Sequence, residues 1–256
     1  MPNASTGPRA GQHEQMLAKV RKLLAKAEDP AATAGEAETY NAKAAELMAA
    51  YGIDRALLAA SDPDSDVVGD RVVVLDAPYA RDKATLLSGI AHELRCRSVL
   101  RTRYPGGAKE LSVHLFGYDS DLLRTDVLFT SLLVQASCGM AGVVVPMGES
   151  VAAFRRSWLA GFTSAVVRRL EEAETRAARQ AEPQGPAAAT QTSLALVLAD
   201  RSVAVADALT RQYPRLRTGR RRALSGSGMA EGWAAGQRAD IGGGRLSRSS
   251  RGALGA

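Results

Sequence analysis

The sequence has only two cysteines in 256 residues, and aromatic residues make up 5% of it. Cys96 and Cys138 are too few for a disulfide framework, so we interpret both as small, buried apolar residues in a reducing compartment. No apolar run approaches the roughly 20 residues needed to cross a bilayer, and residues 1–15 lack the apolar centre of a signal peptide. We therefore expect a cytoplasmic protein with no membrane partner.

The usual catalytic motifs are absent too. There is no G-x-S-x-G nucleophile elbow and no G-x-x-x-x-G-K-[ST] phosphate loop. The stretch GGGR at 242–245 follows no predicted strand, which argues against nucleotide binding there. We therefore expect no cofactor and favour a non-enzymatic protein, although the sequence leaves an enzymatic role open.

The nearest approach to a metal site is the string AHELRC. His92 and Cys96 stand four residues apart, as the two zinc ligands of an H-E-x-x-H helix do, and Glu93 takes the place of the general base. A catalytic zinc needs a third protein ligand, for which only His114, Cys138 or a carboxylate is at hand. We therefore expect no metal, with His92 and Cys96 as the candidates if there is one.

Arginine is in excess and is concentrated toward the C-terminal end. The formal net charge of the chain is +6. Residues 211–256 hold ten arginines against Glu231 and Asp240, a net charge of +8, so the rest of the chain is slightly negative. A basic segment on a near-neutral body is typical of a nucleic-acid contact. The excess of arginine over lysine, 27 to 6, also fits a GC-rich genome without any ligand.

Residues 13–60 are predicted to form a helical hairpin. Apolar residues at helical spacing mark the first helix, and Pro30 biases the chain away from helix at its end. Thr33 and Glu36 then form a T-x-x-E capping box, which starts the next helix.

The second helix is predicted over 34–51, with alanines on one face that allow close approach to its partner. Gly52 fits the left-handed position that ends a helix, and Ile53 can contact Met48 across that stop. Asp54 can cap one further short helix.

These residues resemble a known family. Residues 20–54, VRKLLAKAEDPAATAGEAETYNAKAAELMAAYGID, are similar to the signature of the domain-of-unknown-function 2786 family of bacterial and phage proteins. The shared features are the K-L-L-A run, the D-P turn, the E-A-E-x-x-x-A-K-A-x-E-L-M stretch and the closing Y-G-I. The chain from DKATLLSGIAHELRCRSVL through FRRSWLAGF is similar in layout to the second uncharacterised domain that often follows. The resemblance implies a helical hairpin domain and a bacterial or phage context, but no activity.

The middle of the chain reads as strand, helix, hairpin and helix. RVVVLD is a strand candidate, and CRSVLRTRY with ELSVHLFG predicts a hairpin around the turn PGGAK. His114 alternates with the apolar residues of its strand, so we expect it on a polar surface. The apolar stretch that follows predicts a buried helix, capped near Asp119 or Ser120.

A long helix is predicted over 151–181, with its second half exposed to solvent, and an amphipathic helix over 193–213.

The fold class is α+β: an N-terminal helical hairpin, a small sheet packed with helices, long C-terminal helices and a flexible basic tail. The expected divisions are a disordered leader (1–12), the hairpin domain (13–60), a linker (61–70), the α+β domain (71–181), a second linker (182–192), the amphipathic helix (193–213) and the tail (214–256), which we expect to add little to the fold.

Two stretches have partner-binding patterns. In FRRSWLAGF, Arg155 and Arg156 flank aromatic residues that can either clamp a nucleic acid or form a core stripe. In the tail, glycines recur every fourth residue, which on a helix gives a smooth face for close docking, weak alone because each glycine costs about 1 kcal/mol. The candidate docking residues are Gly228, Gly232, Gly236 and Trp233.

Three hypotheses for function remain open. The preferred one is a non-enzymatic accessory protein that binds nucleic acid, DNA rather than RNA, through its arginine-rich C-terminal segment. The candidate contacts are Arg215, Arg217, Arg220, Arg221, Arg222, Arg238, Arg245, Arg155 and Arg156. The first alternative is an adaptor that docks a protein partner's helices through alanine and glycine faces. The second is a zinc-dependent hydrolase centred on His92 and Glu93.

Overall fold

The computed structural model describes residues 34–182, 193–217, 219, 223–239 and 241, together with Lys19, Val20, Lys22, Leu23 and Lys26, which are helical. The predicted turn at Pro30 and Thr33 lies outside the described residues. So do the candidate contacts Arg220, Arg221, Arg222 and Arg245.

A three-stranded antiparallel sheet forms the centre of the fold, in the order β1-β3-β2. The strands are β1 (Val68–Leu75), β2 (Arg97–Arg103) and β3 (Glu110–Tyr118). β2 and β3 are the predicted hairpin, joined through the short 3-10 turn Pro105–Gly107, and β1 pairs with the other edge of β3. With the helices, this sheet confirms the α+β class.

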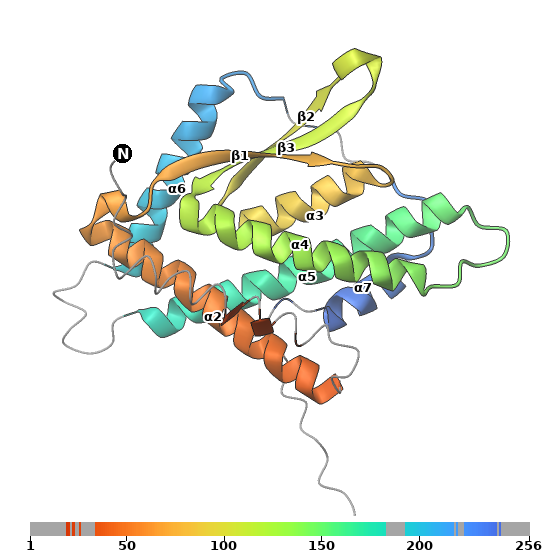
Figure 1. Ribbon diagram of the computed structural model, residues 1–256, viewed down its shortest axis with the longest axis horizontal. Coiled ribbons are helices and arrows are strands. Elements are labelled where there is room, and N and C mark those ends of the chain that lie inside the picture. Colours follow the sequence, from red (N-terminus) through yellow and green to blue (C-terminus); the bar gives the residue numbers. More distant parts are fainter. Residues whose placement is uncertain are drawn as a thin grey trace, which may run out of the picture.

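The helices form layers on both sides of the sheet (Figure 1). They are α2 (Ala34–Ser61), α3 (Ala80–Glu93), α4 (Asp119–Ala141), α5 (Val151–Ala181), α6 (Leu194–Gln212) and α7 (Met229–Arg238). α3 and α4 pack under one face of the sheet, α5 packs under α3, and α2 and α7 pack against α5. α6 lies against the other face. The predicted bounds of α5 agree with the structure.

The core lies between the inner face of the sheet and α3. Leu111, Val113 and Leu115 of β3 point into it, and the apolar stripe of α3 meets them there. Met48 and Tyr51 of α2 belong to the same core cluster. The segment predicted as a hairpin domain therefore packs directly on the α+β unit.

Gly52 does not end a helix, because α2 runs without a break to Ser61. The prediction of a stop at Gly52 and a new cap at Asp54 is wrong. A Cβ at Gly52 would overlap the guanidinium of Arg124, which is fully buried. The glycine is used for a close approach between α2 and α4 rather than for a left-handed turn.

The predicted linker over 61–70 is partly wrong. Residues 68–70 belong to β1, and Asp66 just before them is buried. Asp66 also takes the role of cap for α4: its carboxylate accepts hydrogen bonds from the backbone N–H of Ser120, at 3.1 Å, and from the Ser120 hydroxyl, at 2.7 Å. The helix therefore begins at Asp119 with a cap supplied from a distant segment, not by Asp119 or Ser120.

The segment expected as a flexible tail contains α7, which is docked on α5. The backbone of Gly232 lies so close to that of Trp158 that a Cβ at position 232 would overlap the Trp158 carbonyl. Ser227 donates to Glu149 at the start of the helix, with oxygen atoms 2.6 Å apart. At its end, Arg169 donates to the carbonyls of Gly236 and Ala239. Beyond α7, Ala239 and Ile241 are buried in the core.

One further expectation is corrected, and it concerns the cysteines. Cys138 is exposed on α4, whereas Cys96 is buried as predicted. Among the helices that the structure describes, none has the length and apolar character required to cross a membrane.

Candidate nucleic-acid interface

One face of the sheet carries most of its polar side chains, and we call it the outer face. His114 and Phe116 of β3 point to this side, opposite to the side chains that enter the core. Residues directly opposite in an antiparallel pair share a face, so the register places Arg97, Val99, Arg101 and Arg103 of β2 on the outer face as well. Three arginines of one strand therefore project from the same side of the sheet.

The chain leaving α6 is fixed to this outer face. The Tyr213 hydroxyl lies 2.7 Å from His114 Nδ1, and His114 Nε2 lies 2.7 Å from Asp70 Oδ2. Because an ionised carboxylate only accepts, Nε2 carries the proton that is donated to Asp70. In the neutral imidazole Nδ1 then accepts from the Tyr213 hydroxyl. The edge of the Tyr213 ring also meets Phe116. His114 is thus buried, not on a polar surface, because Tyr213 covers it.

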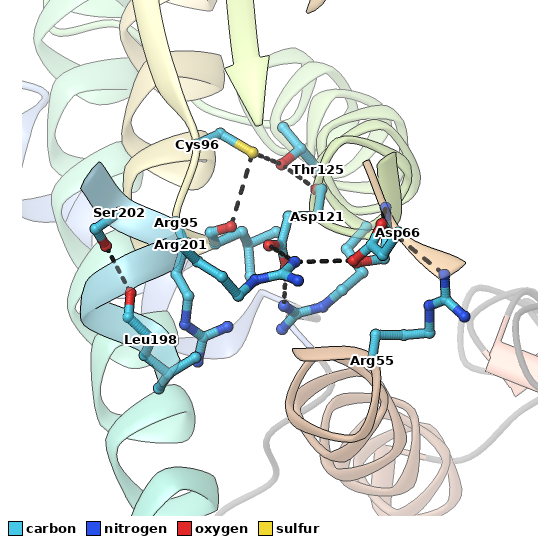
Figure 2. Close-up of polar contacts among 12 residues, drawn as sticks. Arg55, Asp66, Arg95, Cys96, Asp121, Thr125, Leu198, Arg201 and Ser202 are labelled. Atoms are coloured by element: carbon cyan, nitrogen blue, oxygen red, sulfur yellow. Dashed lines mark hydrogen bonds and ion pairs between the residues drawn. The ribbon is translucent and has the colours of Figure 1, made fainter. Parts of the chain in front are cut away.

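A second anchor holds α6 through Arg201, two turns into the helix. The guanidinium of Arg201 lies over the Tyr118 ring, 3.5 Å from its centroid. Its Nη2 is 2.9 Å from Asp66 Oδ2 and 3.1 Å from Asp121 Oδ2. Figure 2 shows these three side chains meeting, with Arg55 of α2 beside Asp66. Since both carboxylates are buried, the position of α6 over the sheet is closely specified.

This contact is part of an alternating chain of seven charged side chains. Asp121 pairs with Arg124 at 3.0 Å, Arg124 with Glu174, and Glu174 with Arg95 at 2.8 Å. Burial opposes the charge of Arg124, yet Glu174 and Asp121 raise its pKa above the ordinary value. The chain runs Arg55, Asp66, Arg201, Asp121, Arg124, Glu174, Arg95. Glu174 is therefore buried in the half of α5 that was expected to be exposed.

The two anchors define the path of the arginine-bearing segment. Arg201 meets Tyr118 at one end of β3, and Tyr213 meets His114 four residues nearer the hairpin turn. The chain therefore advances along the outer face toward the hairpin. Arg211, Arg215 and Arg217 are exposed on either side of the anchored Tyr213. Together with the arginines of β2 they make up a set that we call the basic strip: Arg97, Arg101, Arg103, Arg211, Arg215 and Arg217.

Three acidic residues adjoin the basic strip: Asp70, Glu110 and Asp207. Asp70 keeps more than half of its side chain exposed but is engaged with His114. Glu110 stands opposite Arg103 in the register of the hairpin. Asp207 is exposed on α6, one helical turn before Arg211. The strip thus carries six guanidinium groups beside three carboxylates, which leaves a net positive surface.

The structure separates the other candidate contacts from this strip. Arg155 and Arg156 are at the start of α5, and Arg238 is at the end of α7, on the side of α5 away from the sheet (Figure 1). The aromatic residues beside Arg155 and Arg156 are buried, with Phe154 and Trp158 each 1% exposed, so they cannot stack on bases. The aromatic clamp proposed for FRRSWLAGF is therefore wrong.

The glycine face of α7 is already occupied. Gly228, Gly232 and Gly236 all lie against the backbone or side chains of α5, and Trp233 lies near Arg168 of the same helix. The predicted close docking takes place within the chain. This face is not open to the helix of a protein partner.

The candidate zinc ligands are not brought together. α3 ends at Glu93, and Arg95 has a left-handed backbone, so Cys96 does not follow His92 on a helix face. His92 is exposed, whereas Cys96 is buried beside Thr125. Burial raises the pKa of Glu93, with Glu171 and Glu174 adding to the rise and His92 opposing it. Across the described part of the chain, no group of three or more His, Cys, Asp or Glu side chains is placed to hold a metal ion.

Sequence reasoning missed the arginines of β2. Their signal was present, because Arg101 and Arg103 alternate along a predicted strand and so share a face. What the sequence could not show is that the segment following α6 returns to that same face. That placement depends on Tyr213 and His114, which are 99 residues apart.

The fold defines an α+β protein in which helices enclose a small antiparallel sheet with one basic outer face. Within it, residues 15–55 match the model of a family described as a protein of unknown function, DUF2786. The match confirms the resemblance of the N-terminal segment. Comparisons with curated proteins and with solved structures gave no match.

Proposed function

We propose that the protein binds nucleic acid, with DNA as the first candidate, through the basic strip. The observation that carries the proposal is the anchoring of the Arg211–Arg217 segment onto the sheet face that already carries the arginines of β2. Guanidinium groups pair with phosphate oxygens and release condensed counterions, which supplies affinity without sequence preference. Because the strip is already held on the sheet, less conformational entropy is lost on binding than with a free tail.

The alternatives have less support. The adaptor hypothesis relied on alanine and glycine faces, and α5 covers the glycine face, that of α7. The hydrolase hypothesis relied on His92 and Cys96 facing one site, and they lie in different surroundings. Neither is favoured by a specific observation.

Salt-dependent binding tests the proposal. If about five arginines of the strip meet phosphates, log affinity for duplex DNA falls against log salt with a slope of about −4 to −5. Replacing Arg211, Arg215 and Arg217 together by glutamine reduces the magnitude of that slope by about 3. Fluorescence anisotropy of a labelled duplex over a range of potassium chloride concentrations measures both.

A matched control replaces Arg156, Arg176 and Arg179 by glutamine. These three arginines are exposed on α5, away from the sheet, and the substitution removes the same charge. The control keeps the wild-type slope if the strip is the interface. An equal loss of slope in both triple variants would show that only net charge matters and would overturn the assignment.

A further inference from the structure

We infer that the turn of the β2–β3 hairpin is an arm that enters the major groove of duplex DNA. The arm comprises residues 102–110. This inference rests on the proposed function and specifies its ligand: duplex rather than single-stranded nucleic acid, contacted from the groove side as well as along the phosphates.

The arm projects from the rest of the molecule (Figure 1). β1 pairs with β3 only as far as Leu111, so the pair formed by Arg103 and Glu110 and the turn beyond it are supported by no third strand. Every residue from Thr102 to Lys109 is exposed, and Tyr104 is 64% exposed. Left-handed glycines, Gly106 with φ 59° and Gly107 with φ 84°, close the turn without bulky side chains at its tip.

The dimensions of the arm suit the groove. Two paired strands lie about 4.8 Å apart, and the major groove is about 12 Å wide, so a two-stranded ribbon with its side chains fits. From Arg103 to the tip is about three residues, or roughly 10 Å, similar to the groove depth of about 8.5 Å. The minor groove, about 6 Å wide, is too narrow for the ribbon without deformation of the DNA.

The chemistry of the arm matches the acceptors that the groove presents. Arg103 and Lys109 are cationic donors beside the turn, and guanine offers its N7 and O6 atoms as acceptors in the major groove. Tyr104 adds an exposed ring with a hydroxyl group. Arg97 and Arg101 continue from Arg103 along the same face, so they reach the flanking phosphates when the arm is inserted.

Methylation by dimethyl sulfate tests the groove directly, because guanine N7 lies in the major groove and adenine N3 in the minor groove. A short duplex of mixed sequence is saturated with the full chain at low salt, and methylation at both atoms is measured. We expect guanine N7 methylation to fall about threefold or more while adenine N3 methylation stays unchanged. The duplex should also bind more tightly than either of its single strands.

The test variant carries Arg103→Gln, Tyr104→Ser and Lys109→Gln, all at exposed positions that leave the core intact. It should restore guanine N7 methylation. The magnitude of the salt slope should fall by less than about 2, because Arg103 and Lys109 contact bases rather than phosphates when the arm is inserted. Met147→Ser, in the exposed turn between α4 and α5, serves as the control and should change neither quantity.

The outcomes separate this inference from the proposed function. Three results would contradict the insertion of the arm while leaving the basic strip as the interface, provided that binding still depends on salt. They are unchanged guanine N7 methylation, protection of adenine N3 instead, and tighter binding to single strands than to the duplex. If the wild-type chain binds no DNA at low salt, the proposed function fails and the inference fails with it. Unfolding of the test variant is checked by thermal denaturation, which should match that of the wild type.

Discussion

Gly52 is placed in the middle of a helix because Arg124 needs the space beside it. The Arg124 guanidinium is fully buried, and Asp121 and Glu174 hold it there. Such a charge is stable in the core only while its partners stay in place. A side chain at position 52 would displace Arg124 and so disturb the ion pairs of the whole alternating chain of charges.

We predict that Gly52→Ala destabilises the protein although alanine favours helices. Displacing Arg124 from its partners costs about 3 kcal/mol or more, against a gain of about 1 kcal/mol in helix propensity. The free energy of unfolding should fall by about 2 kcal/mol, measured by urea denaturation. Gly142→Ala is the control, because a Cβ there has room and the backbone is right-handed, so its stability should not fall. A Gly52→Ala protein as stable as the wild type would show that Arg124 moves freely.

The two thiols should differ in reactivity. Burial raises the pKa of Cys96 from 9.0 to about 12, with Asp121 adding to the rise, while Cys138 is exposed. Because the thiolate is the nucleophile, an aromatic disulfide reagent at pH 8 should modify one thiol quickly and the second only after unfolding. Cys138→Ser should remove the fast phase. Two fast thiols in the native wild type would contradict the burial of Cys96.

The raised pKa of the Cys96 thiol also determines how the stability of the fold changes with pH. The folded chain keeps the Cys96 proton to higher pH than the unfolded chain does. The contribution of this thiol to stability is therefore complete below pH 9 and is lost as pH rises toward about 12.

At the scale of elements, α7 depends on its contact with α5. Its glycines allow the two backbones to approach closely, and the helix is too short and too rich in glycine to be stable alone. Glu149 and Arg169 bind its two ends from outside. The helix and its docking therefore form together.

Gly232→Ala should undock α7. The new methyl group would overlap the Trp158 carbonyl, which belongs to a rigid helix and cannot yield. We expect a loss of about 3 kcal/mol in stability and faster hydrogen exchange in α7. Ala230→Gly, on the exposed side of the same helix, should cost only about 1 kcal/mol. Equal effects of the two substitutions would mean that helix propensity, not contact with α5, holds α7.

Elements with a strong local period could be predicted from the sequence, and those fixed by distant partners could not. The stripe of Phe154, Trp158 and Phe162 identified α5, and alternation identified β3. The continuity of α2 and the docking of α7 depend on Arg124 and Trp158, which are far away in the chain. The same limit applies to the site: charge identified Arg215 and Arg217, but only the contact of Tyr213 with His114 places them beside β2.

At the scale of the whole molecule, the basic C-terminal part serves the fold as well as the proposed interface. The chain first crosses the outer face of the sheet with α6 and then returns to the opposite side of the molecule as α7 (Figure 1). Deleting everything from Arg211 onward would therefore remove two things at once. Loss of DNA binding in such a protein could not be assigned to lost charge.

Two shorter deletions separate these roles. Removing residues 223–256 takes away α7, Ala239 and Ile241 and uncovers the side of α5 on which α7 docks, next to Phe154, Trp158 and Phe162. These three residues are each 1% exposed in the intact fold. Fully uncovering a large apolar side chain costs about 1.5–3 kcal/mol, and a chain of this size loses about 2–4 °C per kcal/mol. Because the Trp158 ring stays packed on Gly139 of α4, the exposure is partial, and Tm should fall by roughly 10 °C or more. Removing only residues 242–256 leaves every described contact in place, and Tm should stay within about 2 °C of the wild type. Differential scanning calorimetry measures both, and equal Tm values for the two deletions would show that α7 contributes nothing to the fold.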